Sequence, residues 1–321
     1  MSWNEILTQG MPFPGLNGKT TQNDLRSEGM IEMATRLTER DMAFFRELIY
    51  FGYLTAKHLV SSGFFPNEKK ARDRLRLLHH AGYLEYCLKP YLGPGRSEHV
   101  YYLSPKRVGE IAGLLGCVRE DIHLVKPVYS PVLLHHLAIN EFIICLQTAC
   151  KRSGIYEANI IPEYRKLSGR GKLKKATSQS IIVRGADAEI IPDGIVCLNR
   201  SDVKTLLFFE IYRGTQALEG KERSIRNKLE AYTSYCDQKL YKNFSELFSY
   251  SFAGFRVLMI VYSASYLEKL KKICSELGHT GLFWLTLEKD VSPDSILKPI
   301  WQVPGEEMLK AIVNNKGKGS G

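Results

Sequence analysis

Two apolar runs, each interrupted by one acidic residue, constrain this chain more than any other feature. They are Ile190-Ile-Pro-Asp-Gly-Ile-Val196 and Leu206-Leu-Phe-Phe-Glu-Ile-Tyr212. The second run is apolar at almost every position, which is typical of a strand buried on both faces of a sheet. Asp193 and Glu210 fall toward the ends of the predicted strands. The chain is therefore expected to form a helix-covered sheet that carries carboxylates at its edge.

The segments around these runs extend the pattern into an α/β fold. In chain order, the predicted elements are a helix at 131–151, strands at 155–164, 181–183, 188–196 and 206–212, a helix at 219–237, a strand at 256–262, a helix at 266–277 and a strand at 281–287. Strands that alternate with helices in this way predict a mixed sheet packed against helices.

The first third of the chain has the pattern of a winged helix-turn-helix, so the fold is α+β when the chain is taken as a whole. Thr38, Thr55 and Asn67 each stand where a helix N-cap is expected. A predicted β-hairpin follows over 83–103, with the Gly93-Pro-Gly-Arg96 turn at its tip. Three helices followed by a hairpin are typical of a winged helix.

These patterns divide the chain into four parts. The predicted parts are a flexible N-terminal arm at 1–36, a winged-helix domain at 37–127, a mixed-sheet α/β domain at 128–304 and a C-terminal tail at 305–321. The arm is rich in Gly, Pro and Asn and has no apolar periodicity, which is typical of a segment without a packed core.

Charge indicates the class of partner. The chain has 44 Lys and Arg residues against 34 Asp and Glu residues, a formal net charge of +10. This excess favours a polyanion such as nucleic acid, or an anionic membrane surface. We find no apolar run of membrane-spanning length and no secretory signal, and we expect no membrane association. The seven cysteines are scattered without a C-x-x-C pair, which fits the cytoplasm and argues against structural zinc.

The third predicted helix places cations opposite its apolar face, as in helices that enter a DNA major groove. A Gly-rich basic loop near residue 172 would touch the phosphate backbone. The candidate DNA-binding residues are Lys69, Lys70, Arg72 and Arg76 on the helix, Arg96 at the hairpin tip, and Lys172, Lys174 and Lys175 in the loop. The alternatives are a solvated helix in a protein-binding winged helix and a plain surface loop.

The acids at the sheet edge form a candidate metal site. Alternate residues of a strand share a face, so Glu210 is expected to project with Tyr212. Glu141, from the preceding helix, would approach the same face, and together with Asp193 these carboxylates would hold Mg²⁺ or Mn²⁺. Lys228, in the apolar stripe of the next helix, would stabilise charge on a reacting phosphate.

Each of these acids also has a structural interpretation. Glu141 would sit at the edge of its helix stripe in a salt bridge, and Asp193 and Glu210 would merely cap strand ends. For the neighbouring pair His135-His136 we expect ordinary polar contacts, because adjacent helical residues point in different directions.

Pro192-Asp193 followed by Glu210-Ile-Tyr212 resembles the motif of the PD-(D/E)xK nuclease superfamily. The lysine that this superfamily carries two residues after the Glu is Tyr212 here. Some members place the lysine on the following helix, where Lys228, or less well Lys221, stands. The resemblance implies metal-dependent cleavage of DNA, with catalytic roles for Asp193, Glu210, Lys228 and Glu141, and the substitution at Tyr212 leaves activity open.

A longer pattern resembles the plasmid replication-relaxation family and the similar MobC-type mobilisation relaxases. It comprises the winged helix, His136-Leu-Ala-Ile-Asn140, Pro192-Asp-Gly194, Glu210-Ile-Tyr-Arg-Gly-Thr215, Lys228-Leu-Glu-Ala-Tyr232 and Trp301-Gln-Val-Pro304. The resemblance implies a protein that binds double-stranded DNA at an origin-like site and nicks or relaxes it. Other mobilisation or replication proteins and a second copy of the chain are further possible partners.

Competing functions remain open at this stage. The chain could instead be a non-catalytic origin-binding replication or transcription factor with a degenerate nuclease fold as scaffold. A relaxase with two histidines around one apolar residue is discounted, because no histidine pair has that spacing. An enzyme with a tyrosine nucleophile is a further alternative, for which Tyr212 is the obvious candidate.

Overall fold

The structure is a computed structural model. It describes residues 36–90, 97–126, 130–164, 166–167, 174–175, 177–183, 186–201, 203–214, 218, 220 and 224–312. The predicted arm before residue 36, the domain boundary predicted at 127/128 and the end of the predicted tail fall outside these residues.

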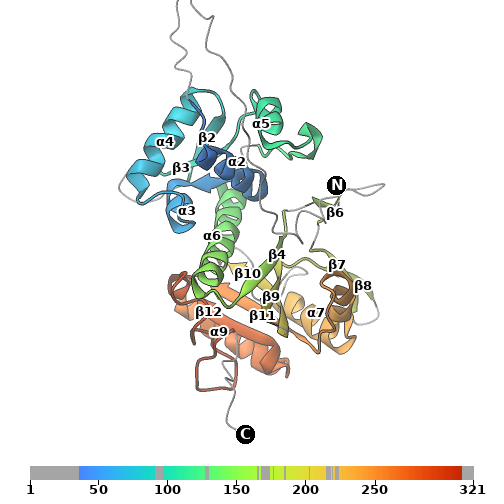
Figure 1. The fold of residues 1–321 in the computed structure, drawn as a ribbon. Coiled ribbons are helices and arrows are strands. Elements are labelled where there is room, and N and C mark those ends of the chain that lie inside the picture. Colours follow the sequence, from blue (N-terminus) through green and yellow to red (C-terminus); the bar gives the residue numbers. More distant parts are fainter. Residues whose placement is uncertain are drawn as a thin grey trace, which may run out of the picture.

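The N-terminal part follows the predicted order of helices and hairpin (Figure 1). Its elements are α2 (Glu39–Phe51), β1 (Leu54–Thr55), α3 (Ala56–Ser61), α4 (Glu68–His80), β2 (Leu84–Leu88), β3 (His99–Leu103), α5 (Val108–Leu115) and η1 (Arg119–Asp121). The three strands pair in the order β1-β3-β2. The side chains of Thr38, Thr55 and Asn67 accept backbone N–H groups at the starts of α2, α3 and α4, which confirms the predicted caps.

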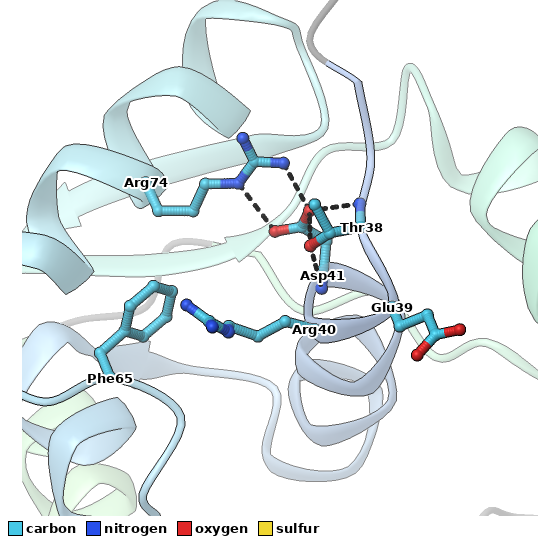
Figure 2. A pocket seen from close by; sticks show the side chains of 6 residues that line it. All are labelled: Thr38, Glu39, Arg40, Asp41, Phe65 and Arg74. Carbon is cyan, nitrogen blue, oxygen red and sulfur yellow. Dashed lines mark hydrogen bonds and ion pairs between the residues drawn. The ribbon is translucent and has the colours of Figure 1, made fainter.

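A buried ion pair fixes α4 against α2. The carboxylate of Asp41 accepts a hydrogen bond from Arg74 Nε at 2.9 Å and contacts Nη2 of the same guanidinium (Figure 2). Thr38 donates its N–H and its hydroxyl to this carboxylate, each at 2.7 Å. Burial opposes ionisation of Asp41, but the bonds from Arg74 and Thr38 outweigh it and lower the pKa. The direction of α4 is thereby set from within the domain.

Helix α6 (Ser130–Ser153) runs from the N-terminal part to the large sheet (Figure 1). Leu133 and Leu137 pack against the three-stranded sheet, and Phe142 packs on Phe209 of the large sheet with ring centroids 4.5 Å apart. Contrary to our expectation, one segment, 131–153, is long and apolar enough to cross a membrane by length and composition, with a mean hydropathy of 1.3. Within this segment 61% of the tested window is buried, as in a core helix.

Polar side chains of α6 hold the turn between α2 and β1. His136 Nε2 donates to the carbonyl of Phe51 at 2.7 Å. Asn140 Nδ2 donates to the same carbonyl at 3.2 Å and to that of Tyr53 at 2.7 Å. Gly52 between them has φ 72°, and a Cβ there would lie 2.8 Å from Val125. A side chain at Gly52 would clash, and loss of these hydrogen bonds would leave buried carbonyls without donors. The turn therefore fixes how α6 packs on the N-terminal part.

The large sheet is mixed, as predicted. Its strands, in the spatial order β12-β11-β10-β9-β4, are Phe283–Leu287, Phe255–Val261, Val203–Tyr212, Gly194–Arg200 and Glu157–Pro162. β10, β11 and β12 run parallel, whereas β9 is antiparallel to both β10 and β4. The remaining elements are the short pairs β5 (Lys166–Leu167) with β6 (Lys174–Lys175) and β7 (Gln179–Val183) with β8 (Ala186–Ile190), helices α7 (Ile225–Asp237), α8 (Phe244–Leu247) and α9 (Ala264–Glu276), and the 3-10 turns η2 (Leu240–Asn243), η3 (Thr280–Leu282) and η4 (Glu288–Asp290).

Strand β10 separates two hydrophobic cores. Phe209 and its same-face neighbours belong to the cluster that contains α6 residues, while Phe208 and Tyr212 belong to the cluster of α7 and α9 residues. Every described side chain of β10 from Leu206 to Tyr212 is buried, so the prediction of a strand covered on both faces is confirmed. Glu210 projects with Phe208 and Tyr212, as predicted from the period of two.

Two predicted boundaries are corrected. The single strand expected over 188–196 is two strands, because β8 pairs with β7 in a separate two-stranded sheet and the chain enters the large sheet as β9 only after Pro192. The helix expected from Glu219 begins at Ile225, where the Ser224 side chain accepts the N–H of Asn227.

Candidate metal centre

The site forms where β9 ends beside a longer β10. The backbone N–H of Asp193 donates to Phe209 O at 3.1 Å, and the N–H of Glu163 donates to Asp193 O at 2.8 Å. One residue pair further, Asp193 Oδ2 accepts the N–H of Ile211 at 2.6 Å. The carboxylate thus accepts the N–H of β10 that has no backbone acceptor on β9. Together, the three hydrogen bonds to main-chain groups fix the position of Asp193.

Gly194 lets this end of β9 lie flat under an aromatic ring. A Cβ at Gly194 would lie 2.2 Å from the ring of Phe209. The close approach explains why the predicted acid is followed by glycine. It also holds Asp193 against the strand that carries Glu210.

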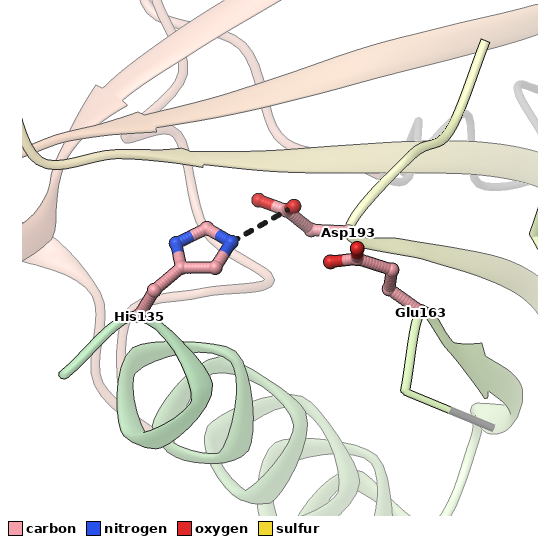
Figure 3. A group of neighbouring side chains, drawn as sticks. All are labelled: His135, Glu163 and Asp193. Atoms are coloured by element: carbon pink, nitrogen blue, oxygen red, sulfur yellow. Dashed lines mark hydrogen bonds and ion pairs between the residues drawn. The ribbon is translucent and has the colours of Figure 1, made fainter. Parts of the chain in front are cut away.

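Three side chains converge on the α6 side of the sheet: His135 from α6, Glu163 after β4 and Asp193 before β9 (Figure 3). Their potential ligand atoms all lie within 4.8 Å of one another. His135 Nε2 donates to Asp193 Oδ1 at 3.1 Å. The His135 side chain is 37% exposed and that of Asp193 only 8%, so solvent reaches the group past the imidazole.

Glu210 faces the other way, toward α7. Its Oε2 accepts from Lys228 Nζ at 2.5 Å, and its Oε1 accepts from the hydroxyl of Tyr232. The Glu210 side chain is 3% exposed and that of Lys228 is 25% exposed. Lys228 reaches the sheet from the apolar face of its helix, as predicted.

Burial and charge perturb these groups in opposite directions. Burial and the nearby carboxylate of Asp193 together raise the pKa of Glu210 to about 7, because the opposing effects of Lys228 and Tyr232 offset them only in part. Burial also opposes ionisation of Asp193, but hydrogen bonding and attraction from His135, with the field of Lys228, lower its pKa. Of the two acids, Asp193 therefore ionises more readily, and Glu210 carries a proton far more readily than an ordinary glutamate.

The two cations respond to the whole group. Burial works against protonation of His135 and of Lys228, yet the pKa of each is raised because carboxylates surround it. Asp193, Glu163 and Glu210 all contribute at both positions. The two sides of the sheet edge thus form one electrostatic cluster.

The expected approach of Glu141 to this cluster is wrong. Its carboxylate contacts Lys57 Nζ at 3.2 Å and His58 Nε2 at 3.1 Å, both on α3. Glu141 lies six residues after His135 on the same helix, which turns it by about 240°. It therefore belongs to the joint with the N-terminal part, which corresponds to the salt-bridged alternative.

Tyr212, at the position of the motif lysine, is buried and points into the α7–α9 core. Burial and the neighbouring Glu210 and Asp193 raise its pKa well above the ordinary value. Its hydroxyl has no hydrogen-bond partner among the residues that the structure describes. A buried phenol that resists ionisation is poorly suited to attack a phosphate.

The candidate DNA-binding residues are only partly within the described chain. Lys69, Lys70, Arg72 and Arg76 are exposed on α4, whose opposite face buries Ala71, Leu75 and Leu78 as predicted. Arg72 is paired with Glu68 at 2.8 Å. Arg96, Lys172 and the alternative lysine Lys221 fall outside the described residues, and Lys174 and Lys175 form strand β6.

The sequence patterns did not place His135 or Glu163 in the candidate metal site, and the polar contact expected of His135 is made with Asp193. Glu163 had a signal, because it follows Pro162 at the end of β4 just as Asp193 follows Pro192. His135 had none, since only the docking of α6 decides which of two adjacent histidines faces the sheet.

A sequence model described as replication-relaxation matches residues 45–249. No curated protein matches. Two solved structures are similar over 81% of this chain. They are the restriction endonuclease FokI, with 15% identity and a TM-score of 0.29, and FokI bound to DNA, with 14% identity and a TM-score of 0.27. The chain spans less than half of each, covering 44% and 45% of those chains.

Proposed function

This chain belongs to the replication-relaxation family, and from that premise we propose that it binds double-stranded DNA at an origin-like site and nicks one strand with the help of a divalent metal ion. The observation that carries the proposal is the convergence of His135, Glu163 and Asp193 at the sheet edge. This group lies beside the buried pair of Glu210 and Lys228.

The donor set fits a divalent cation. Two carboxylates and one imidazole lie close enough together to share an ion after small side-chain movements. An imidazole ligand favours Mn²⁺ over Mg²⁺, because magnesium prefers an all-oxygen shell. The cluster holds three carboxylates against the cations Lys228 and His135, so a bound cation would relieve its excess negative charge.

The chain's own residues would share the work of cleavage. Asp193, fixed by its backbone contacts, would hold the ion together with Glu163 and His135, and the ion would supply an activated water and polarise the phosphate. Glu210 would tune the cluster through its readiness to take a proton. Lys228 would place a positive charge near the reacting phosphate, on the helix that follows the PD-(D/E)xK-like motif.

The N-terminal part would bind DNA as a winged helix and bring it to this site. Helix α4 presents Lys69, Lys70, Arg72 and Arg76 on its exposed face, and the net charge of +10 favours a phosphate backbone. We further propose a cytoplasmic protein that works beside other replication or mobilisation proteins, with a second copy of the chain as one possible partner.

A second candidate function has its own observation. Four charged groups of the site already pair within the chain, His135 with Asp193 and Lys228 with Glu210. A scaffold that binds an origin without cutting it would be built in the same way.

A nicking assay on supercoiled plasmid carrying the cognate origin separates the two functions. Wild type should convert plasmid to the open circular form only with Mn²⁺ or Mg²⁺, and Asp193→Asn should abolish conversion while duplex binding persists. Asp187→Asn, at an exposed acid on β8, is the matched control and should nick normally. Tight binding without metal-dependent nicking by wild type would refute the enzyme and favour the scaffold.

A further inference from the structure

We propose that the β2–β3 hairpin binds unpaired DNA bases by stacking them on the rings of Tyr86 and His99. This surface is distinct from the metal site and lies beside the cationic face of α4. The inference rests on the proposed function only in taking DNA as the ligand, and it adds single-stranded DNA as a second form of that ligand.

The rings form a preassembled platform. Tyr86 and His99 lie parallel, with centroids 4.2 Å apart and an interplanar angle of 9°. His79, from the last turn of α4, meets the Tyr86 ring edge-on at 4.9 Å, and its Nδ1 is held by Leu84 O at 2.9 Å. Tyr101 packs behind the pair at 6.1 Å and 6.0 Å. Because neighbouring rings fix the pair, stacking on it costs little side-chain entropy.

This platform lies on the face of the hairpin that elsewhere forms the core. Leu84 and Leu103 on that face are buried near α4, yet toward the hairpin tip Tyr86 is 41% exposed and Leu88 56% exposed. The apolar face of the hairpin thus continues onto the surface at Tyr86 and Leu88. Burial, together with His79 and Arg76, lowers the pKa of His99, which favours the uncharged form of the ring for stacking.

The surrounding charge selects a nucleic acid. The positive charge of Arg76 lies close enough to act toward a lower pKa at both His99 and Tyr101, and that of Arg72 acts on the pKa of Tyr101 in the same direction. Rings next to arginines combine base stacking with attraction to phosphates, as in surfaces that bind single strands.

The flat platform fits unpaired bases better than a duplex. In a duplex each base face is already covered by its neighbours, and proteins read the edges by hydrogen bonding. The faces that Tyr86 and His99 turn toward each other are already covered, so a base would stack on an outward ring face of the pair. With the cations of α4 beside it, this surface would hold the strand that leaves a locally opened duplex.

The test uses the full-length protein and two fluorescent probes, an oligo(dT) strand and a blunt duplex of unrelated sequence. Tyr86→Ala should weaken oligo(dT) binding about tenfold or more, the range for loss of one stacked base. Duplex affinity should change less than about twofold, since α4 is untouched. Tyr86→Phe, which keeps the ring, should bind both probes like wild type.

Leu114→Ala, at an exposed apolar residue on α5, controls for a general loss of surface, and thermal unfolding of each variant controls for folding. Equal loss on both probes would overturn the inference and make the pair a duplex contact. Absence of oligo(dT) binding by wild type would also overturn it and leave the rings to a protein partner. Nicking is not measured in either arm, so failure of the proposed function would not imitate these outcomes.

Discussion

Two groups of charged side chains lie beside α6, and they differ in the ratio of carboxylates to basic side chains. At the joint with α3, one carboxylate, Glu141, meets two basic side chains, Lys57 and His58. Burial resists its ionisation, but these partners dominate and hold its pKa at about 2. At the sheet edge, carboxylates outnumber the cations, and the pKa of Glu210 rises to about 7.

The ratio of carboxylates to basic side chains distinguishes an ion pair that holds elements together from a cluster that could bind a metal ion. A carboxylate faced by two basic side chains stays ionised down to low pH and serves as a joint between elements. A cluster with surplus carboxylates is electrostatically unsatisfied, and a bound cation would stabilise it. Counting the charges that face each acid is therefore more informative than finding acids on one helix stripe.

The largest expected effect sharpens this contrast through metal binding. Glu163→Gln should weaken Mn²⁺ binding about tenfold to a hundredfold, because a ligand loses its charge. Glu141→Gln should leave Mn²⁺ affinity unchanged, since its carboxylate lies on the α3 side of α6. Isothermal titration calorimetry of both variants checks this. Equal losses would mean that Glu141 belongs to the site after all.

The next effect concerns the joint itself. Asn140→Ala removes the donors to Phe51 O and Tyr53 O, both deep in the interior. The free energy of unfolding should fall by about 2 kcal/mol, because the buried Tyr53 O loses its Asn140 donor, whereas Phe51 O keeps the bond from His136. Urea unfolding measures it. Thr148→Val, which deletes one bond to Ser61 O at 3.2 Å, is the milder control, and an equal loss there would contradict a special role for Asn140.

A smaller effect distinguishes the two acids by the sign of their pH dependence. Glu141 has a lowered pKa, so its contribution of about 1 kcal/mol is present above pH 4.5 and is lost as pH falls toward 2. Glu210 has a raised pKa, so folding favours its protonated form and stability declines as pH rises from 4.5 through 7.

Unfolding of Glu141→Gln and Glu210→Gln, measured between pH 3 and 8 without metal, should show these opposite slopes relative to wild type. The Glu141→Gln protein should approach wild-type stability only in acid. The Glu210→Gln protein should gain relative stability as pH rises. Parallel slopes would remove the electrostatic distinction between the clusters.

The smallest effect tests the tyrosine alternative. Tyr212→Phe deletes a buried hydroxyl that has no partner among the described residues. Stability should stay within about 1 kcal/mol of wild type or rise slightly. Nicking, where present, should persist, and no covalent DNA adduct should form in either protein on denaturing gels. Loss of nicking in this variant alone would make Tyr212 the nucleophile.

Much of this arrangement was predictable from local pattern. The caps at Thr38, Thr55 and Asn67 were identified because side-chain capping depends on residues three apart. The shared face of Glu210 and Tyr212 followed from the period of two along a strand. The break at Pro192 was only half anticipated, because proline predicts an end to pairing without saying where the chain goes next.

The sequence by itself determined the strands of the sheet, the acid at each strand end and the cationic face of α4, since these depend on neighbours within a turn or a strand. Only the tertiary structure decided that His135 rather than Glu141 meets Asp193. A helix carries both residues on different sides, and the choice depends on how His136 and Asn140 seat α6 on the distant Phe51 turn. Contacts between residues this far apart in the chain leave no pattern in the local sequence, so only the folded structure shows which side chains make up the cluster.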